Sequence, residues 1–331
     1  MKNRFYKKEI IILICLVGIL ALVVVFGLIA KMDDKAGNNP FTDDEFSYSD
    51  YAGDQIYYES EWYVPNDSIE SILILGIDKK EDGSKDRQNS EQADFLALVV
   101  MNKDDETYQI LHLNRDTMTD IPQTDAFGEV YGYVEGQLTL AHTYGNNDKI
   151  RCRNTENTVE KLLYGIDIDH YLSLTMDAVA ILNDSIGGVT VQLMDDFTEL
   201  DESFVKDAVV TLKGEQALAY VQARGSLEDN TNLHRMERQQ QYIAALIEKL
   251  SGYDFENTVD TMMEVNEYLV SDCTVDQLSR MIERLGSYTY EGTVSPEGEA
   301  VKGAEFMEYH VDDQALQALV VEMFYELRND Q

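Results

Sequence analysis

Charged residues stand where apolar, strand-like segments of this 331-residue sequence begin or end. The segment TYQILHLNRD (107–116) is mostly apolar until it reaches Arg115 and Asp116, and another apolar segment ends at Asp78. A third begins with Ala-Asp, so that Asp94 is its second residue. Carboxylates beside a guanidinium group can bind a divalent metal and a phosphate, whereas a single strand-terminal charge is often only solvated. The question is whether the fold gathers these residues.

A hairpin would bring two of them together. ADFLALVVMN (93–102) and the segment 107–116 are both rich in strand-forming residues, and the polar tetrapeptide KDDE separates them. This pattern predicts an antiparallel hairpin. If the turn is centred in the middle of KDDE, Asp94 lies directly opposite Arg115, where side chains of paired strands can meet.

The first strand-like segment, SILILGID (71–78), extends this prediction. If it lies beside and parallel to the segment 107–116, Asp78 joins the other charged residues at one edge of the sheet. Ligands of α/β sheets often bind at such strand ends.

Downstream, helical patterns dominate, and one helix begins with two arginines. Arg235 and Arg238 are three residues apart and should project from one face of the helix 236–250. Its free N–H groups and positive dipole end favour a phosphate there, although a solvated basic helix end is the alternative. In the same helix we expect Tyr242 and Leu246 to face the core. The other predicted elements are the helices 157–165, 177–187 and 214–224 and the strand 188–193.

Composition and charge exclude some function classes. The formal net charge is −36, and the first 31 residues carry +4, so the remainder carries −40. A surface this acidic argues against nucleic acid binding, which needs basic patches to neutralise phosphates.

The strongest compositional signal is an apolar run, residues 10–30, long enough to cross a bilayer as one helix. Basic residues precede it and two aspartates follow it, which predicts a cytoplasmic N-terminus and an extracellular remainder. We expect an anchor rather than a cleaved signal peptide, since no clear A-x-A-like site follows the run. We therefore expect residues 1–9 to be cytoplasmic and residues 10–30 to form the transmembrane anchor. Residues 31–66 would be an acidic linker, whose aromatic residues could pack on the domain, and residues 67–331 would form an extracellular domain.

Cysteine and histidine residues give weak signals. Cys152 and Cys273 can form a disulfide or remain two buried thiols, and their spacing favours neither. The five histidines show no metal-ligand spacing, so each is expected to be a surface residue or a hydrogen-bonded core residue.

Several motifs in a fixed order resemble the LytR-CpsA-Psr family between about residues 70 and 250. They are GID (76–78), ADF (93–95), NRDT followed by DIP, LAHTYG, IDHYLSLTMDAVAILNDSIGGVTV and GEQALAYVQAR with HRMERQQQ. The resemblance implies an α/β fold, an α-β-α sandwich with a central mixed β-sheet after one N-terminal transmembrane helix. It also implies a Gram-positive phosphotransferase that moves an anionic glycopolymer from an undecaprenyl-pyrophosphate carrier to peptidoglycan. The lipid tail would lie in an apolar pocket.

The resemblance also implies residue roles. Asp78 and Asp94 would bind Mg²⁺ or Mn²⁺, and Arg115 would bind the pyrophosphate together with Gln222 and three further arginines: Arg224, Arg235 and Arg238. Asp94, Arg115 and Asp116 would form the catalytic group, with Asp116 orienting Arg115 or taking a proton. Guanidinium groups and a divalent metal suit this chemistry because phosphoryl transfer depends on neutralising charge on the phosphate oxygens.

Two positions depart from the family pattern. Gln222 and Gln92 stand where family members commonly have arginine, and glutamine can bond a phosphate oxygen without supplying charge. Reduced activity is one expectation. The alternative function is a module that binds polyprenyl-phosphate lipids without transferring a polymer, or that only hydrolyses the pyrophosphate.

Overall fold

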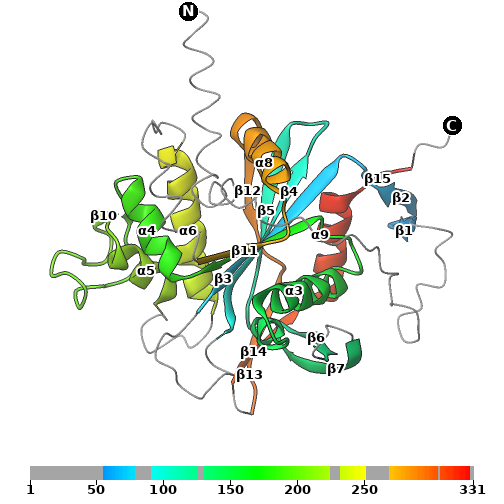
Figure 1. The fold of residues 1–331 in the computed structure, drawn as a ribbon, viewed down its shortest axis with the longest axis horizontal. Coiled ribbons are helices and arrows are strands. Elements are labelled where there is room, and N and C mark those ends of the chain that lie inside the picture. Colours follow the sequence, from blue (N-terminus) through cyan, green and yellow to red (C-terminus); the bar gives the residue numbers. More distant parts are fainter. Residues whose placement is uncertain are drawn as a thin grey trace, which may run out of the picture.

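A six-stranded mixed sheet forms the centre of the computed structural model (Figure 1). Its strand order is β11-β8-β3-β4-β5-β12. The strands are β3 (Ile69–Ile77), β4 (Ala93–Asn102), β5 (Thr107–Leu113), β8 (His170–Thr175), β11 (Leu269–Ser271) and β12 (Thr289–Val294). The structure describes residues 55–78, 91–125, 130–223, 232–250, 268–304 and 306–328.

The predicted hairpin is confirmed, and its register is the expected one. β4 and β5 are antiparallel, with Asn102 paired to Thr107 at the turn and Leu96 paired to Leu113 at the far end. The expectation that the first strand lies beside the third is wrong. β4 lies between β3 and β5, and β3 has β8 as its parallel neighbour. β3 and β5 still run in the same direction, because each is antiparallel to β4, so their C-terminal ends share one edge.

Helices cover both faces of this sheet, which explains why its strands are apolar on both sides. One face packs against α3 (Asp148–Leu162) and α9 (Asp313–Phe324), with Cys152, Val159 and Leu316 among the buried contacts. The other face packs against α6 (Leu233–Leu250) and α8 (Val275–Ser287). α3 begins well before the predicted helix 157–165. Asn147 caps its first turn by accepting a hydrogen bond from the Ile150 N–H, a local signal that the apolar pattern does not contain.

A second apolar cluster lies beside the sheet, on the left in Figure 1. It is built from α4 (Asp177–Ser185), α5 (Glu215–Gln222), β9 (Val189–Gln192), β10 (Val209–Leu212) and one side of α6. Tyr242 and Leu246 are buried in it, which confirms their predicted orientation. α6 therefore packs against both the sheet and the second cluster.

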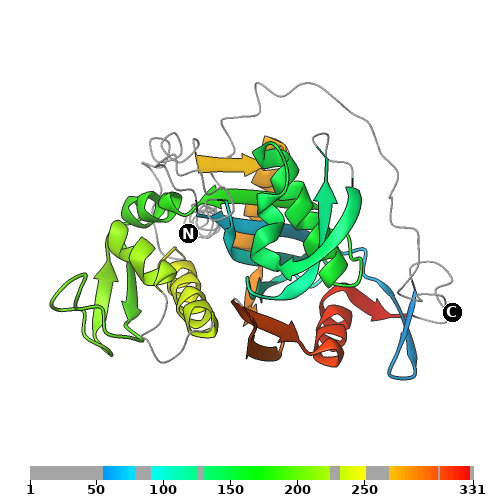
Figure 2. The same ribbon diagram turned by 90° about the horizontal axis from the view of Figure 1, so that it is seen from below.

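Smaller sheets complete the fold (Figure 2). β6 (Met118–Thr124) pairs with β7 (Val130–Gln137), and β13 (Gly298–Lys302) pairs with β14 (Met307–Val311). β1 (Ile56–Tyr58), β2 (Glu61–Pro65) and β15 (Tyr325–Leu327) form a third sheet, and η4 (Leu138–Thr143) is a short 3-10 helix. The boundary expected near residue 67 is therefore too late, because the end of the predicted linker pairs with the C-terminal strand.

The described residues contain no helix that is long and apolar enough to cross a membrane. The predicted anchor, residues 10–30, and most of the linker lie outside them. Cys152 and Cys273 are both free. Cys152 belongs to the core beneath α3, whereas Cys273 packs with the core on the other face of the sheet.

Candidate active site

A bulge at the start of β4 presents Asp94. Gly76 pairs with Phe95 and Ile77 pairs with Ala93, so Asp94 is an extra residue without a partner on β3. Ala93 then faces the core under α3, while Phe95 faces the opposite core. Such bulges redirect a side chain and are common beside active sites.

The residues after β5 form a tightly bonded turn. The Asn114 side-chain oxygen accepts a hydrogen bond from the Asp116 N–H at 3.0 Å, which is the Asx turn that asparagine favours. The Thr117 N–H donates to the Asn114 carbonyl at 3.0 Å, and the Tyr309 N–H donates to the Asp116 carbonyl at 2.9 Å. These bonds fix the backbone that carries Arg115.

Arg115 and Asp94 are in contact, as the hairpin geometry predicted. Arg115 Nη1 donates to Asp94 Oδ1, and Arg115 Nη2 donates to Gln92 Oε1 at 2.6 Å. Arg115 Nε lies 3.4 Å from Asp116 Oδ1. Only 7% of Arg115 is exposed. Gln92, at one of the departures from the family pattern, therefore bonds this guanidinium group as an acceptor.

Arg235 joins the same cluster from α6. Its Nη1 lies 3.7 Å from Asp94 Oδ2, and the residue is buried. The start of α6 is tied to the turn after β5, because the Asn232 amide donates to the Asn114 side-chain oxygen at 3.0 Å. Both arginines thus approach one carboxylate, Asp94, from different elements.

Arg238 has other partners than Arg235, although the two residues are three apart on α6. Its Nη1 lies 2.7 Å from Asp195 Oδ2, its Nε donates to the Tyr220 carbonyl at 3.2 Å, and its Nη2 donates to the Ala223 carbonyl. A fully buried guanidinium group needs such partners, and the C-terminal turn of α5 offers carbonyls that the helix itself leaves unbonded. Arg238 therefore fixes the end of α5.

The other residues predicted for the site have fewer contacts with the charged cluster in the part of the chain that the structure describes. Asp78 follows β3, is half-buried, and donates from its N–H to the Gln92 carbonyl at 3.2 Å, which places it beside the entry to β4. Gln222 is the last residue of α5 and is half-buried. Arg224 lies outside the described residues.

His112 is a neighbour of the cluster that the sequence did not single out. Burial, and then the charge of Arg235, lower the pKa of its imidazole to about 3, so the ring is neutral at ordinary pH. It lies 4.9 Å from the Phe95 ring, centroid to centroid, and 3.5 Å from the Gln240 side-chain nitrogen. The expectation of a hydrogen-bonded core histidine fits this environment.

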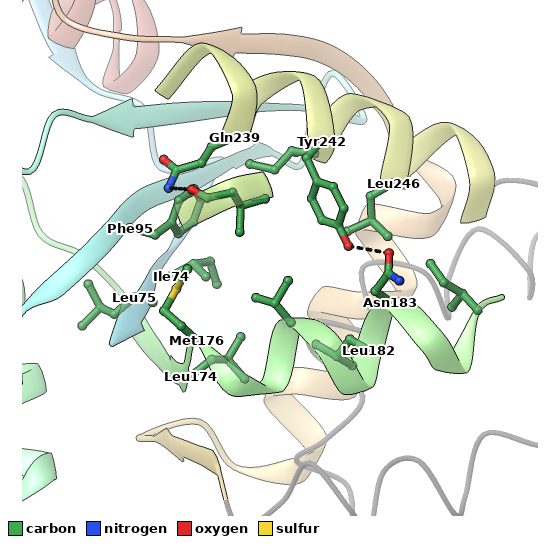
Figure 3. A pocket seen from close by; sticks show the side chains of 15 residues that line it. Ile74, Leu75, Phe95, Leu174, Met176, Leu182, Asn183, Gln239, Tyr242 and Leu246 are labelled. Carbon is green, nitrogen blue, oxygen red and sulfur yellow. Dashed lines mark hydrogen bonds between the residues drawn. The ribbon is translucent and has the colours of Figure 1, made fainter. Parts of the chain in front are cut away.

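An apolar pocket adjoins the cluster (Figure 3). It lies between α4 and α6, and Phe95 and Gln239 are among its wall residues. Most of its fifteen lining side chains are apolar, and the exceptions are Asn183, Gln239 and Tyr242. Its empty volume is about 800 Å³, including the space open to solvent.

The absence of a side chain at Gly76 lets the pocket wall pack close to the charged cluster. A Cβ at this position would lie 2.8 Å from Met176 Sδ and 2.9 Å from Phe95 Cβ, so a larger residue would push the wall apart. Phe95 is also the residue after Asp94, and Gln239 is one helical turn after Arg235. The charged cluster and the pocket therefore share the same two elements, β4 and α6.

Asp78 and Asp94 can supply ligands for a divalent ion. Both offer hard oxygen atoms at one sheet edge, and Mg²⁺ commonly uses one or two carboxylates and completes its shell with water and substrate phosphates. Asp78 and the four charged residues of the cluster (Asp94, Asp116, Arg115 and Arg235) together carry a formal charge of −1, so a bound Mg²⁺ would make this sheet edge positive and attractive to a pyrophosphate. The donor set therefore fits this ion.

In the part of the chain that the structure describes, one other group of potential metal ligands occurs. His170, Asp272 and Cys273 offer ligand atoms within 4.8 Å of one another. They lie at the N-terminal end of β8, away from Asp94, and about a hundred residues separate the histidine from the other two. No spacing motif in the sequence predicts such a group. The Gln277 side-chain nitrogen already lies 3.0 Å from His170 Nε2, and the Tyr171 N–H donates to Asp272 at 3.0 Å.

Comparisons with known proteins place this geometry in context. The LytR_cpsA_psr family model matches residues 31–323. The chain is 28% identical over 210 residues to the polyisoprenyl-teichoic acid–peptidoglycan teichoic acid transferase TagU of Halalkalibacterium halodurans, covering 62% of each chain. It is 30% identical over 223 residues to the transferase TagT of Bacillus subtilis, covering 63% of each. The aligned part is therefore less than two thirds of either relative's length.

The fold is similar to that of a solved structure described as TagT bound to LI-WTA. The TM-score is 0.59 with 25% sequence identity, and the similar region covers 82% of this chain and 95% of the other. The shared architecture is an α/β fold with a mixed central sheet.

Proposed function

Because the chain belongs to the LytR-CpsA-Psr family, we propose that it transfers an anionic glycopolymer from an undecaprenyl-pyrophosphate carrier to peptidoglycan. The single observation that carries the proposal is the junction of the charged cluster with the apolar pocket. A polyprenyl pyrophosphate has an anionic head joined to an apolar tail, and this junction offers a partner for each part.

The arginines bind the head group in this proposal. Arg115 already donates to the Asp94 carboxylate, and Arg235 lies near the same carboxylate. A phosphate can take the place of that carboxylate at the same guanidinium nitrogens. The tail then lies along α6, past Gln239 and into the pocket. Gln222, the last residue of α5, would donate a hydrogen bond to a phosphate oxygen, and Arg224, two residues later in the sequence, would add positive charge. Arg238 acts indirectly by holding the end of α5 in place.

Asp78 and Asp94 would hold Mg²⁺, or Mn²⁺, against the pyrophosphate oxygens. The ion would supply positive charge where negative charge builds during transfer. Gln92 keeps Arg115 in place through its 2.6 Å bond, without adding charge of its own.

Asp116 orients Arg115 and is well fixed for that role. Its Oδ1 accepts a hydrogen bond from the Gln137 amide at 3.0 Å and lies beside Arg115 Nε. In the reaction, an acceptor hydroxyl oxygen bonds to the phosphorus that carries the polymer, and the bond from that phosphorus to the lipid phosphate breaks. The hydroxyl proton passes to a carboxylate, for which Asp116 and Asp94 are the candidates.

Membrane attachment belongs to the same proposal. The apolar run 10–30 would anchor the chain with its N-terminus in the cytoplasm and its folded domain outside, where the lipid carrier and the peptidoglycan meet. The related transferases carry polyisoprenyl-teichoic acid and peptidoglycan in their names. We extend both substrates to this chain.

The test is a transfer assay with the full-length chain. Lipid-linked polymer, Mg²⁺ and peptidoglycan oligomers are incubated with wild type and with Arg115→Ala, and the linked product is measured by mass spectrometry. Product in the wild-type reaction alone supports the proposal. Lipid binding without product contradicts it and supports the non-catalytic lipid-binding module, while release of phosphate without product indicates hydrolysis alone.

A further inference from the structure

The ends of two neighbouring strands bring a histidine, an aspartate and a cysteine together. β11 is antiparallel to β8, with Ser271 paired to Leu172, so the residues after β11 lie beside the first residues of β8. Those residues are Asp272 and Cys273, and β8 begins with His170. Ligand atoms of the three side chains lie within 4.8 Å of one another. Imidazole, carboxylate and thiolate groups are all ligands of protein-bound zinc.

The distance between two of these groups fits a bridging metal better than a direct hydrogen bond. His170 Nδ1 lies 3.6 Å from Asp272 Oδ1, which is too long for a hydrogen bond. This nitrogen is buried and makes no hydrogen bond with a residue that the structure describes. Nitrogen and oxygen ligands of a tetrahedral zinc ion, each about 2.0–2.1 Å from it, lie about 3.3 Å apart. An ion between the two side chains would give the buried nitrogen a partner after a small adjustment.

Hydrogen bonds fix the loop that carries the aspartate and the cysteine. The Tyr171 N–H donates to Asp272 Oδ1 at 3.0 Å, and the Cys273 N–H donates to Ser271 Oγ at 3.1 Å. The same Ser271 hydroxyl donates to the Tyr171 carbonyl at 2.7 Å. The backbone of β8 therefore holds both residues of the loop, and metal binding needs little movement of the backbone.

The Gln277 side chain holds the other ring nitrogen of His170. Its nitrogen lies 3.0 Å from His170 Nε2, and its oxygen accepts a hydrogen bond from the Thr274 N–H at 2.9 Å in the cap of α8. When a metal binds Nδ1, the ring proton is on Nε2 and needs an acceptor, so the Gln277 amide has to turn its oxygen towards the ring. This turn weakens the cap. A carboxylate at position 277 would serve the ring and the cap together.

Solvent reaches the three residues, and their chemistry favours zinc over magnesium. Asp272 is exposed, whereas His170 and Cys273 are partly buried. Three protein ligands leave the fourth position of a tetrahedral ion for water. Magnesium prefers oxygen ligands, while thiolate and imidazole groups suit zinc. His170 lies opposite Ile72 of β3, and the charged cluster lies beyond Ile77 at the other end of that strand. The two metal sites are therefore distinct.

We propose that His170, Asp272 and Cys273 bind a zinc ion that fastens β11 to β8. β11 is an edge strand of the central sheet and is only three residues long. An ion bound from both strands adds a link that this short pairing does not supply. Because the metal binds the folded arrangement of the three residues, it stabilises the fold at this edge of the sheet. The proposal does not depend on the proposed function.

Cobalt tests the cysteine as a ligand in the full-length chain. Co²⁺ is added to wild type, Cys273→Ser and Cys152→Ser, and the near-ultraviolet absorption band of a cobalt–thiolate bond is measured. We expect the band with wild type and with Cys152→Ser, but not with Cys273→Ser. Cys152 is the matched control, because it is a second free thiol in the core on the other face of the sheet. Excess Mg²⁺ should leave the band unchanged, whereas Zn²⁺ should remove it.

Zinc affinities then show whether the three residues act as one site. His170→Gln and Cys273→Ser should each weaken Zn²⁺ binding at least about 100-fold, since loss of an outer-shell partner alone commonly costs 10–100-fold. Gln277→Glu should strengthen it about tenfold, because its carboxylate accepts the ring N–H and still caps α8. Zn²⁺ should raise the melting temperature of wild type but not of Cys273→Ser.

Two results overturn the inference. One is a cobalt–thiolate band or a zinc affinity that is unchanged in Cys273→Ser. The other is no gain in zinc affinity with Gln277→Glu, a variant that keeps the test decisive if Cys273→Ser fails to fold, because glutamate suits the same cap.

Discussion

The contact between Asp94 and Arg115 permits a quantitative test of the site. The two side chains are only 13% and 8% exposed, and Asp94 also lies 3.7 Å from Arg235. Removing one partner of a buried ion pair costs about 3–5 kcal/mol, because the other charge stays buried. Arg115 keeps Gln92 and Asp116 as neighbours, so we expect Asp94→Asn to lower the free energy of unfolding by about 3 kcal/mol.

A double-mutant cycle isolates the pair from these other contacts. Asp94→Asn and Arg115→Met are made singly and together, and the free energy of unfolding is measured by urea denaturation. We expect a coupling energy of about 2 kcal/mol, in the range of close and largely desolvated charge pairs.

The chain supplies a matched control for this cycle. Lys161 and Asp120 form an ion pair of 3.4 Å whose side chains are 33% and 51% exposed. The cycle Lys161→Met with Asp120→Asn should give about 0.5 kcal/mol, as for surface pairs. The reasoning is refuted if the Asp94–Arg115 coupling is no larger than that of the surface pair.

Three further predictions concern acid–base behaviour, activity and packing. Burial, and then the charge of Asp272, raise the pKa of the Glu156 carboxyl to about 8. The folded protein therefore has its full stability below pH 4.5, where Glu156 is neutral, and loses part of it as the pH rises through 8. Above pH 8, Glu156→Gln should be more stable than wild type by about 2 kcal/mol, and thermal melts should show the two proteins converging towards pH 4.5. Gln222→Arg adds a guanidinium group at the end of α5 and should raise kcat/KM for transfer about tenfold; an unchanged value would place this residue outside the phosphate site. Gly76→Ala should lower the free energy of unfolding by about 1–3 kcal/mol, because its methyl group meets Met176 and Phe95, and a neutral result in urea denaturation would show that the wall yields.

The hairpin shows what local sequence can predict. A polar tetrapeptide between two strand-forming segments fixed the register, and the register placed Asp94 near Arg115. The strand order was not predictable in the same way. β8 lies beside β3 because the chain crosses over through α3, and nothing local to β3 indicates which strand will be its parallel neighbour.

The two arginines of α6 show a similar limit. A spacing of three residues predicts roughly one helix face, but the partners of each side chain are set by other elements. Arg235 meets the bulge of β4, whereas Arg238 meets Asp195 and the end of α5. The pocket was predictable only from the family resemblance, since its residues come from β3, β4, β8 and three helices and share no motif.

In the proposed function, one ligand occupies both the charged cluster and the pocket. The direct measurement is mass spectrometry of the lipid that copurifies with the full-length chain, for wild type and for Arg235→Ala. We predict a polyprenyl phosphate or pyrophosphate with wild type, and a much smaller amount with the variant, because Arg235 stands at the junction of the two parts. Bulk phospholipid alone, or equal amounts of prenyl lipid with both proteins, would contradict binding of one prenyl ligand across the cluster and the pocket.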